Sequence, residues 1–159
     1  MIKYFKEDTT FNFKGKRICS RWIKVVAEKL LPGDEKSSSS TNFINRSKVG
    51  DINIIFCSDS YILDINNKYL KHNYYTDVIT FDYCEGKFLN GDIIISIDTV
   101  RVNANLYKST FDNELHRVII HAVLHLMGYK DKTKKEKEIM RDAEDKALLL
   151  INPIPKIIS

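Results

Sequence analysis

The sequence predicts a single α/β domain of the α+β kind, in which short strands alternate with amphipathic helices. Its 159 residues are enough for one substantial hydrophobic core, and 43% hydrophobic with 29% charged residues is typical of a globular protein. Runs of β-branched residues alternate along the chain with segments of helical periodicity. No internal repeat or change of composition marks a second domain, so we expect one domain over residues 1–159.

The first part of the chain predicts a helix, a loop and a strand. Residues 14–31 carry apolar side chains at helical spacing, and Pro32-Gly33 ends the pattern. The polar, serine-rich segment 34–49 predicts a flexible loop between elements. The apolar residues of segment 51–57, which reads Asp-Ile-Asn-Ile-Ile-Phe-Cys, predict a strand.

The middle of the chain predicts a second helix and two further strands. Ser58 or Asp59 can cap a helix that runs to about residue 70. Residues 76–83 are rich in β-branched and aromatic side chains, which favours a strand. Residues 91–97 read Gly-Asp-Ile-Ile-Ile-Ser-Ile and predict a strand that is buried on both faces.

Three helices are predicted in the remaining chain. Asp98 or Thr99 can cap the first of them. Residues 112–127 form the second, and Gly128 suits a left-handed helix end. A capping-box sequence, Thr-Lys-Lys-Glu, opens the last helix at residue 133.

Hydropathy and cysteine content bear on the class of protein. The longest apolar runs are far shorter than the roughly 18–20 residues of a membrane span, and the first residues contain no apolar signal region. We therefore expect a cytoplasmic protein without a membrane partner. Three separated cysteines (Cys19, Cys57 and Cys84) argue against a disulfide framework and against a cysteine-based zinc site. The net charge of +4 permits a polyanionic partner without requiring one.

Two histidines lie four residues apart in the apolar helix over residues 112–127. His121 and His125 therefore project side by side, at a separation that one metal ion can bridge. An imidazole that is buried without a partner costs on the order of a few kcal/mol, so both rings need one. The alternative to a metal is a pair of core histidines that are hydrogen-bonded to carbonyl groups or to Glu114.

Asp131 is the candidate for a third ligand. It follows the helix end at Gly128 by three residues, so that its carboxylate can return toward the histidines. Two imidazoles and one carboxylate would leave a fourth position for water, as in catalytic zinc sites. The alternative role for Asp131 is a loop carboxylate near the N-terminus of the last helix. Ala122 stands where zinc peptidases of the His-Glu-x-x-His kind carry their general base, which disfavours peptidase chemistry.

Three motifs resemble those of the YbeY family, the bacterial metal-dependent endoribonucleases of rRNA maturation. Residues 121–131, His-Ala-Val-Leu-His-Leu-Met-Gly-Tyr-Lys-Asp, resemble the family signature His-Gly-x-Leu-His-Leu-x-Gly-Tyr-Asp-His. Residues 76–81, Thr-Asp-Val-Ile-Thr-Phe, are similar to the family's Thr-Asp-Val-Leu-Ser-Phe, and residues 91–96 match its Gly-Asp-Ile strand. Their order and spacing agree with the family from about residue 50 to residue 150.

The resemblance implies a compact fold with a small mixed sheet, helices around it and the metal-binding helix in the core. It also implies one zinc ion per chain, held by His121, His125 and Asp131. The implied activity is cleavage of single-stranded RNA in 3′-end maturation of small-subunit (16S) rRNA and in ribosome quality control, with the ribosomal small subunit as partner. We expect metal-bound water to act in place of a side-chain base, although the RNA 2′-hydroxyl can equally be the nucleophile. Glu114 is the candidate for orienting a ligand histidine.

The chain departs from the family at two points that concern ligands and substrate. Asp131 replaces the family's third histidine, a change that a borderline metal tolerates. Leu70 stands where the family carries an arginine, so that Lys71 or His72 would have to bind phosphate instead. Further cations that can contact phosphate if they cluster at the site are Lys68, Arg101, Lys130, Lys132 and Lys134.

Two other functions remain open from the sequence. The first is a non-catalytic, zinc-containing RNA-binding factor of ribosome assembly, which a fourth protein ligand on the metal would favour. The second is a metal hydrolase with a different substrate, such as a peptide, which the missing glutamate disfavours.

Overall fold

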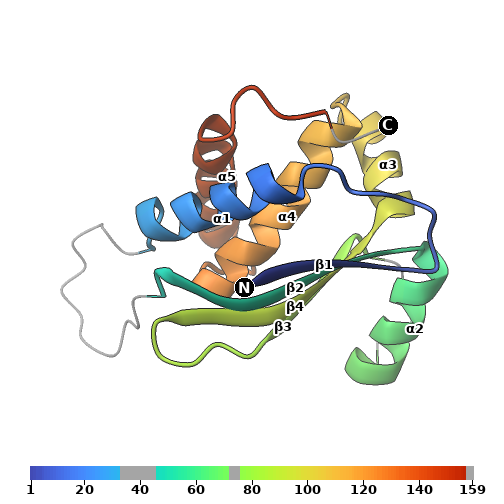
Figure 1. Cartoon of the computed structure of the whole chain (residues 1–159), viewed down its shortest axis with the longest axis horizontal. Helices are drawn as coiled ribbons and strands as arrows, with labels where there is room; N and C mark the ends of the chain where they lie inside the picture. Colours follow the sequence, from blue (N-terminus) through green and yellow to red (C-terminus); the bar gives the residue numbers. More distant parts are fainter. Residues whose placement is uncertain (33–45, 72–75, 157–159) are drawn as a thin grey trace.

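The computed structural model describes residues 1–32, 46–71 and 76–156, and it contains a mixed four-stranded sheet in the order β1-β2-β4-β3 (Figure 1). The strands are β1 (Ile2–Glu7), β2 (Lys48–Cys57), β3 (Val78–Asp82) and β4 (Phe88–Ser96). β1 pairs with β2 and β2 pairs with β4 in parallel, whereas β3 is antiparallel to β4. The predicted α/β class with a small mixed sheet is confirmed.

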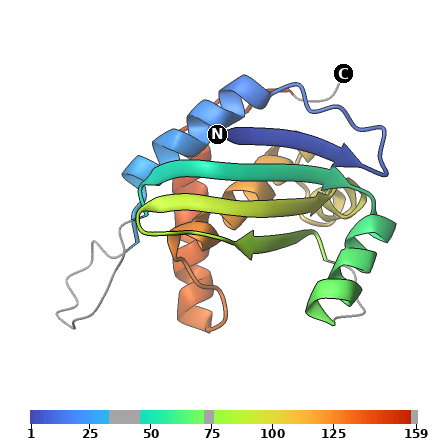
Figure 2. The same ribbon diagram turned by 60° about the horizontal axis from the view of Figure 1, so that its bottom comes forward.

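Helices cover the two faces of the sheet unequally. The helices are α1 (Lys16–Lys29), α2 (Asp59–Leu70), α3 (Ile97–Leu106), α4 (Phe111–Met127) and α5 (Lys134–Leu149). Figures 1 and 2 show α1, α3, α4 and α5 on one side of the sheet, with α2 alone at one end of the other side. The helix that carries the histidine pair, α4, packs on β3 and β4 and has α5 on its other side, whereas α1 packs on β2 beside it.

The main core forms where α4 meets the sheet. Its sheet side includes Ile52, Ile54 and Ile93, which alternate along β2 and β4 and are fully buried. Its helix side comes from α1, α4 and α5, and the Trp22 indole Nε1 donates a hydrogen bond of 2.8 Å to the Ala147 carbonyl oxygen. A smaller apolar cluster joins α2 to the opposite face of the sheet. The predicted burial of the metal-binding helix in the core is thus observed.

Most predicted helix ends are observed. Gly128 ends α4 with a φ of 111°, and Thr133 forms the capping box that opens α5. Ser58 caps α2 by accepting a hydrogen bond from the Tyr61 backbone N–H. The predicted cap of α3 was wrong: Ser96 caps this helix, because its hydroxyl accepts from the Thr99 backbone N–H while β4 runs directly into α3.

Two features of the N-terminal half differ from the sequence-based expectation. β1 was not predicted, because three of its six residues are charged and its pairing partner lies about fifty residues away. β2 begins at Lys48, earlier than the predicted strand, because its first residues pair with Phe88 and Leu89 of β4. The predicted loop over residues 34–49 therefore ends before Lys48, and its residues 34–45 lie outside the described part of the chain.

Gly91 allows α4 to approach the sheet closely. A β-carbon at this position would lie 2.5 Å from the Phe81 carbonyl oxygen and 3.0 Å from a Leu126 methyl carbon. Only a residue without a side chain fits between β3 and the end of α4. The glycine of the Gly-Asp-Ile motif thus fixes the distance between the sheet and the helix that carries the histidine pair.

Two further features concern membrane spans and the cysteine thiols. Among the described residues no helix is both long and apolar enough to cross a bilayer. The three cysteines are free thiols, and burial raises the pKa of the Cys19 thiol to about 12. Cys19 and Cys57 are core residues, whereas Cys84 is only partly buried.

His116 is a buried histidine in α4 that faces away from the pair. Its ring contacts Phe13 and Trp22, and its Nδ1 donates to the Asp112 carbonyl oxygen at 2.7 Å. Its Nε2 has no hydrogen-bond partner among the described residues. Burial lowers the pKa of His116, so the folded protein favours the neutral ring.

We predict that His116 makes the protein less stable in mild acid. Below an unfolded-state pKa of about 6.5, the unfolded chain takes up a proton that the folded chain resists, so stability falls as the pH falls. Urea unfolding of wild type and of His116→Phe between pH 5 and pH 7.5 tests this. The slope of the unfolding free energy should be shallower in the variant by up to about 1.4 kcal/mol per pH unit. Equal slopes in both proteins would contradict the prediction.

Candidate metal centre

The two histidines of the predicted site lie on neighbouring turns of α4. His121 and His125 are partly exposed, whereas most of the helix around them is buried. The left-handed turn at Gly128 reverses the chain after the helix, and Asp131 follows in the connection to α5. Both the helical spacing and the turn therefore bring the three predicted ligands together.

Three ligand atoms converge on one point. His121 Nε2 and His125 Nε2 are 3.1 Å apart, and Asp131 Oδ2 lies 3.4 Å and 3.1 Å from them respectively. Zinc bonds of about 2.0–2.1 Å in tetrahedral geometry place ligand atoms roughly 3.3 Å apart, so this triangle has the size of one face of such a tetrahedron. The three residues form a group that can hold a metal ion.

The other nitrogen of each imidazole has a partner that sets its tautomer. His121 Nδ1 is 2.8 Å from Glu144 Oε2, and His125 Nδ1 is 3.0 Å from the Tyr129 carbonyl oxygen. Because a carboxylate and a carbonyl only accept, each Nδ1 carries the hydrogen and donates it. Each Nε2 then presents a lone pair to the common point. Three electron-rich atoms at this separation repel one another unless a cation or a proton lies between them.

Glu144 has the role that the sequence assigned to Glu114. The prediction that Glu114 orients a ligand histidine was wrong, because Glu144 of α5 occupies the Nδ1 side of His121. Glu114 is buried one helical turn before Arg117, where burial, and next the Asp77 charge, raise the pKa of its carboxyl group. A signal for Glu144 was available, because it interrupts the apolar stripe of α5 formed by Met140, Ala143, Ala147 and Leu148.

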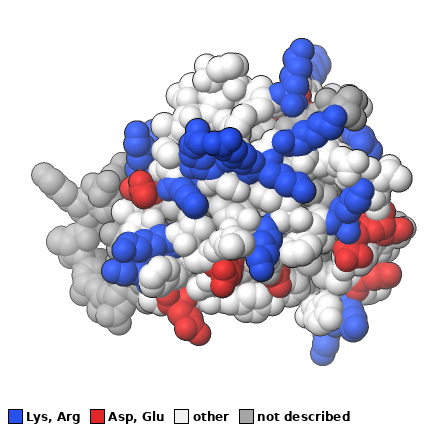
Figure 3. Space-filling view, viewed as in Figure 1, with Lys and Arg blue, Asp and Glu red and all other residues white. Residues whose placement is uncertain are grey.

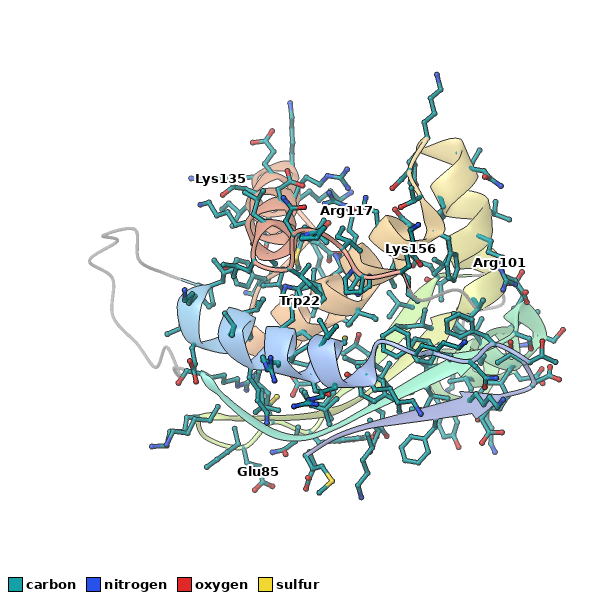
Figure 4. All side chains as sticks on the ribbon, turned by 45° about the horizontal axis from the view of Figure 1, so that its top comes forward. Trp22, Glu85, Arg101, Arg117, Lys135 and Lys156 are labelled. Carbon is teal, nitrogen blue, oxygen red and sulfur yellow. The ribbon has the colours of Figure 1, made fainter. Side chains whose placement is uncertain are left out.

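Arg117 fixes the position of Glu144. Its guanidinium donates to Glu144 Oε1 at 3.0 Å and to Asp145 at 2.8 Å (Figure 4 shows Arg117 beside α5). Each carboxylate oxygen of Glu144 thus has its own partner, Arg117 on one side and His121 on the other. This arrangement satisfies a carboxylate that is only 5% exposed and holds the His121 ring in one orientation.

The protonation of His121 is coupled to its acidic neighbours. Burial alone would lower the pKa of His121, but the hydrogen bond and charge of Glu144, with the charge of Asp131, raise it above its usual value. A metal ion must displace that proton before it binds His121, so metal binding should weaken as the pH falls through this raised pKa.

The convergent atoms lie in the wall of an open cleft of about 710 Å³. Its lining comes from the end of α2, from β3, from α4 and from the connection before α5, and consists of Leu70, Thr76, Asp77, Val78, Thr80, Asp82, His121, His125, Leu126, Asp131 and Lys132. Asp77 belongs to the Thr-Asp-Val motif, and burial raises the pKa of its carboxyl group. Two of the three family-like motifs thus meet at the cleft.

The predicted substrate-binding residues are only partly placed at the cleft. Leu70 lines it, and the exposed Lys71 follows as the left-handed C-cap of α2. His72 lies outside the described residues. Of the other cations considered from the sequence, Lys132 lines the cleft, whereas Arg101 lies over the Phe111 ring.

Sequence reasoning missed one arginine at the rim of the cleft. Arg46 donates to the Leu126 carbonyl oxygen at 3.2 Å and to Asp82 at 3.4 Å, and both of these partners line the cleft. It stands at the end of the serine-rich segment, where nothing in the local sequence distinguishes it from a solvated residue.

A family model described as endoribonuclease YbeY matches residues 7–152. The chain belongs to the YbeY family. It is 53% identical over 152 residues to the endoribonuclease YbeY of Phocaeicola vulgatus, covering 96% of this chain and 99% of that protein. It is 45% identical over 150 residues to the Parabacteroides distasonis protein of the same name, covering 94% and 95% of the two chains. The family resemblance that the three motifs indicated is confirmed.

A solved structure supports the fold of this YbeY-family protein. The solution structure of TM1509 from Thermotoga maritima matches 98% of this chain and 94% of its own, with a TM-score of 0.60 and 24% identity. At this identity the match concerns the fold alone. The overall fold is therefore shared with an experimentally solved protein.

We predict that Glu144→Gln weakens metal binding without unfolding the protein. The amide can still contact His121, but it lacks the charge that strengthens the histidine as a ligand, so affinity should fall about 10–100-fold. Competition with a chelator at pH 7 measures the affinity. Asp142→Asn, a change at an exposed acidic residue of α5 that pairs with Lys146, is the matched control and should bind metal like wild type. Unchanged affinity in Glu144→Gln would remove Glu144 from the site.

Proposed function

We propose that this protein is a zinc-dependent endoribonuclease that cleaves single-stranded RNA in 3′-end maturation of small-subunit (16S) rRNA and in ribosome quality control. The observation that carries the proposal is the convergence of His121 Nε2, His125 Nε2 and Asp131 Oδ2 in the wall of an open cleft. Membership of the YbeY family gives the substrate class. The proposed setting is the cytoplasm, with the ribosomal small subunit as partner.

Zinc suits the donor set of this site. Two imidazole nitrogens and one carboxylate oxygen are ligands that zinc accepts, and three protein ligands are typical of catalytic zinc sites. When bound, the ion supplies a Lewis acid for a phosphoryl oxygen and acidifies water. The chain itself orients His121 through Glu144 and His125 through the Tyr129 carbonyl oxygen, so that both Nε2 atoms are available to the ion.

The non-catalytic assembly factor is less well supported. That function would be favoured by a fourth protein ligand, which closes the coordination sphere of a structural zinc. Among the described residues the group contains three members and no fourth histidine, cysteine, aspartate or glutamate. The cleft in front of the group is open, which suits a substrate better than a closed structural site.

The ligand assignment predicts the zinc content of single variants. Wild type should bind about one zinc per chain, His125→Ala should bind none after dialysis, and Asp131→Ala should bind with an affinity lower by a factor of ten or more. Elemental analysis and chelator competition measure both quantities. Asp64→Ala, which removes an exposed carboxylate from α2, is the control and should retain the metal. Full zinc content in His125→Ala would contradict the assignment of His125 as a ligand.

RNA cleavage should require the bound metal. Zinc-loaded wild type should cleave a single-stranded RNA, and chelation or His125→Ala should reduce the rate at least a hundredfold, since the Lewis acid is lost. The cleavage rate is measured by gel analysis of an end-labelled RNA. A single-stranded DNA of the same sequence serves as the comparison substrate. Metal-loaded protein that binds RNA without cutting it would favour the assembly factor instead.

A further inference from the structure

The described lining of the metal cleft carries little positive charge for binding a polyanion. Its described lining contains three carboxylates, Asp77, Asp82 and Asp131, and the ammonium group of Lys132. The guanidinium of Arg46 at the rim is already paired with Asp82. A bound divalent ion offsets two of these negative charges and leaves little surplus for a chain of phosphates. Because phosphate contacts supply a large share of the affinity of proteins for nucleic acids, a long RNA needs cations beyond those of the described cleft lining.

The exposed face of α1 carries such a surplus. Between Asp8 and Glu28 the chain contains no acidic residue and five basic ones, which are Lys14, Lys16, Arg17, Arg21 and Lys24. All five are exposed, and none forms an ion pair with a described residue. Figure 3 shows Lys and Arg side chains gathered in the middle of this face, where Figure 1 draws α1. We call this set of five residues the α1 basic face.

The start of α1 is unfavourable for a helix that has no anionic partner. Gly15 is its N-cap without a side-chain cap, and its first turn contains no acidic residue. Lys14, Lys16 and Arg17 instead put three cations at the positive end of the helix dipole, where anions are stabilising. A local conflict of this kind is expected where a surface serves binding rather than stability.

The surface beside these cations is hollowed. One shallow hollow lies between α1 and the edge strand β1 and includes Lys3, Lys16 and Arg17. A second is lined by Lys14, Gly15, Arg17, Ile18 and Arg21. Arg17 borders both hollows, and the side chain of Ile18 is 49% exposed among the cations. Phosphates of an extended strand can therefore reach several cations at once.

The α1 basic face is separate from the metal cleft. β1, which borders the first hollow, is one edge of the sheet, whereas β3, which lines the cleft, is the other edge. Three strand spacings put these edges about 14 Å apart. An RNA of a few nucleotides would occupy the cleft alone, while a longer one can reach both surfaces.

We propose that the α1 basic face is a second RNA-binding surface, which holds the phosphate backbone of a substrate whose cleavage site lies in the metal cleft. The proposal rests on the RNA substrate of the proposed function. In this proposal the α1 basic face binds RNA without sequence preference, and the metal centre cleaves it. Removal of α1 charges should weaken binding of long RNA and leave reaction of short RNA unchanged.

The test compares RNA binding by three metal-free proteins in the presence of a chelator, so that cleavage cannot interfere. The α1 variant is Lys14→Gln/Arg17→Gln/Arg21→Gln. The matched control, Lys87→Gln/Lys135→Gln/Lys137→Gln, removes three exposed charges outside α1. Fluorescence anisotropy with a single-stranded RNA of about 20 nucleotides, longer than the roughly 4–16 nucleotides of a typical single-strand site, gives Kd at several salt concentrations.

The α1 variant should bind at least tenfold more weakly at low salt, and its plot of log K against log salt should be shallower by about 2, because each lost phosphate contact removes about 0.7. The control should bind like wild type, and zinc-loaded α1 variant should cleave a tetranucleotide at the wild-type rate. Arg17→Lys/Arg21→Lys, which keeps the charges, should keep the slope.

Equal weakening in the control, or wild-type binding by the α1 variant, would overturn the proposal. Loss of binding to phosphatidylserine vesicles but not to RNA would also overturn it, in favour of a membrane surface. These outcomes are distinct from failure of the proposed function, which would appear as zinc-loaded wild type that cuts no RNA.

Discussion

The structure depends on one constraint, which is that α4 must fill the core and also present two imidazoles to a cleft. Leu115, Ile119 and Ile120 are fully buried on this helix, and burial of each side chain contributes about 1.5–3 kcal/mol. His121 and His125 occupy the remaining stripe, which faces β3 and the connection to α5. Gly91 lets this helix lie close to the sheet, so the packing of the core also fixes the position of the two ligand histidines.

The polar groups on this stripe are satisfied by residues that come from other parts of the chain. Glu144 reaches His121 from α5 and is itself held by Arg117 of α4. The connection between α4 and α5 supplies both the carbonyl oxygen of Tyr129 and the carboxylate of Asp131. α5 packs on α4 through its apolar stripe, and this packing places Glu144 against His121. The orientation of the ligand histidine therefore depends on the stability of the contact between the two helices.

The sequence predicted the features that depend on neighbouring residues, such as helices and their ends. Helical periodicity found α1 and α4, the left-handed glycine found the end of α4, and the Thr133 capping box found the start of α5. Features that depend on distant partners were not predicted. β1 exists because it pairs with β2, and Glu144 is a partner of His121 because two helices pack together. The apolar stripe that Glu144 interrupts was visible in the sequence, but the histidine that it would meet was not.

The metal cleft and the α1 basic face carry opposite charges, which suit different roles. Carboxylates in the cleft favour a divalent cation and oppose a polyanion, so Asp77, Asp82 and Asp131 suit catalysis by a metal better than the capture of RNA. The cations of α1 lie beside the opposite edge of the sheet, where they cannot compete with the metal for its ligands or neutralise the carboxylates around it. Leu70 offers no charge to a phosphate, and Lys132 is the one lysine in the described lining of the cleft, so the proposed phosphate contacts of the α1 basic face would add to the few that this lining can make.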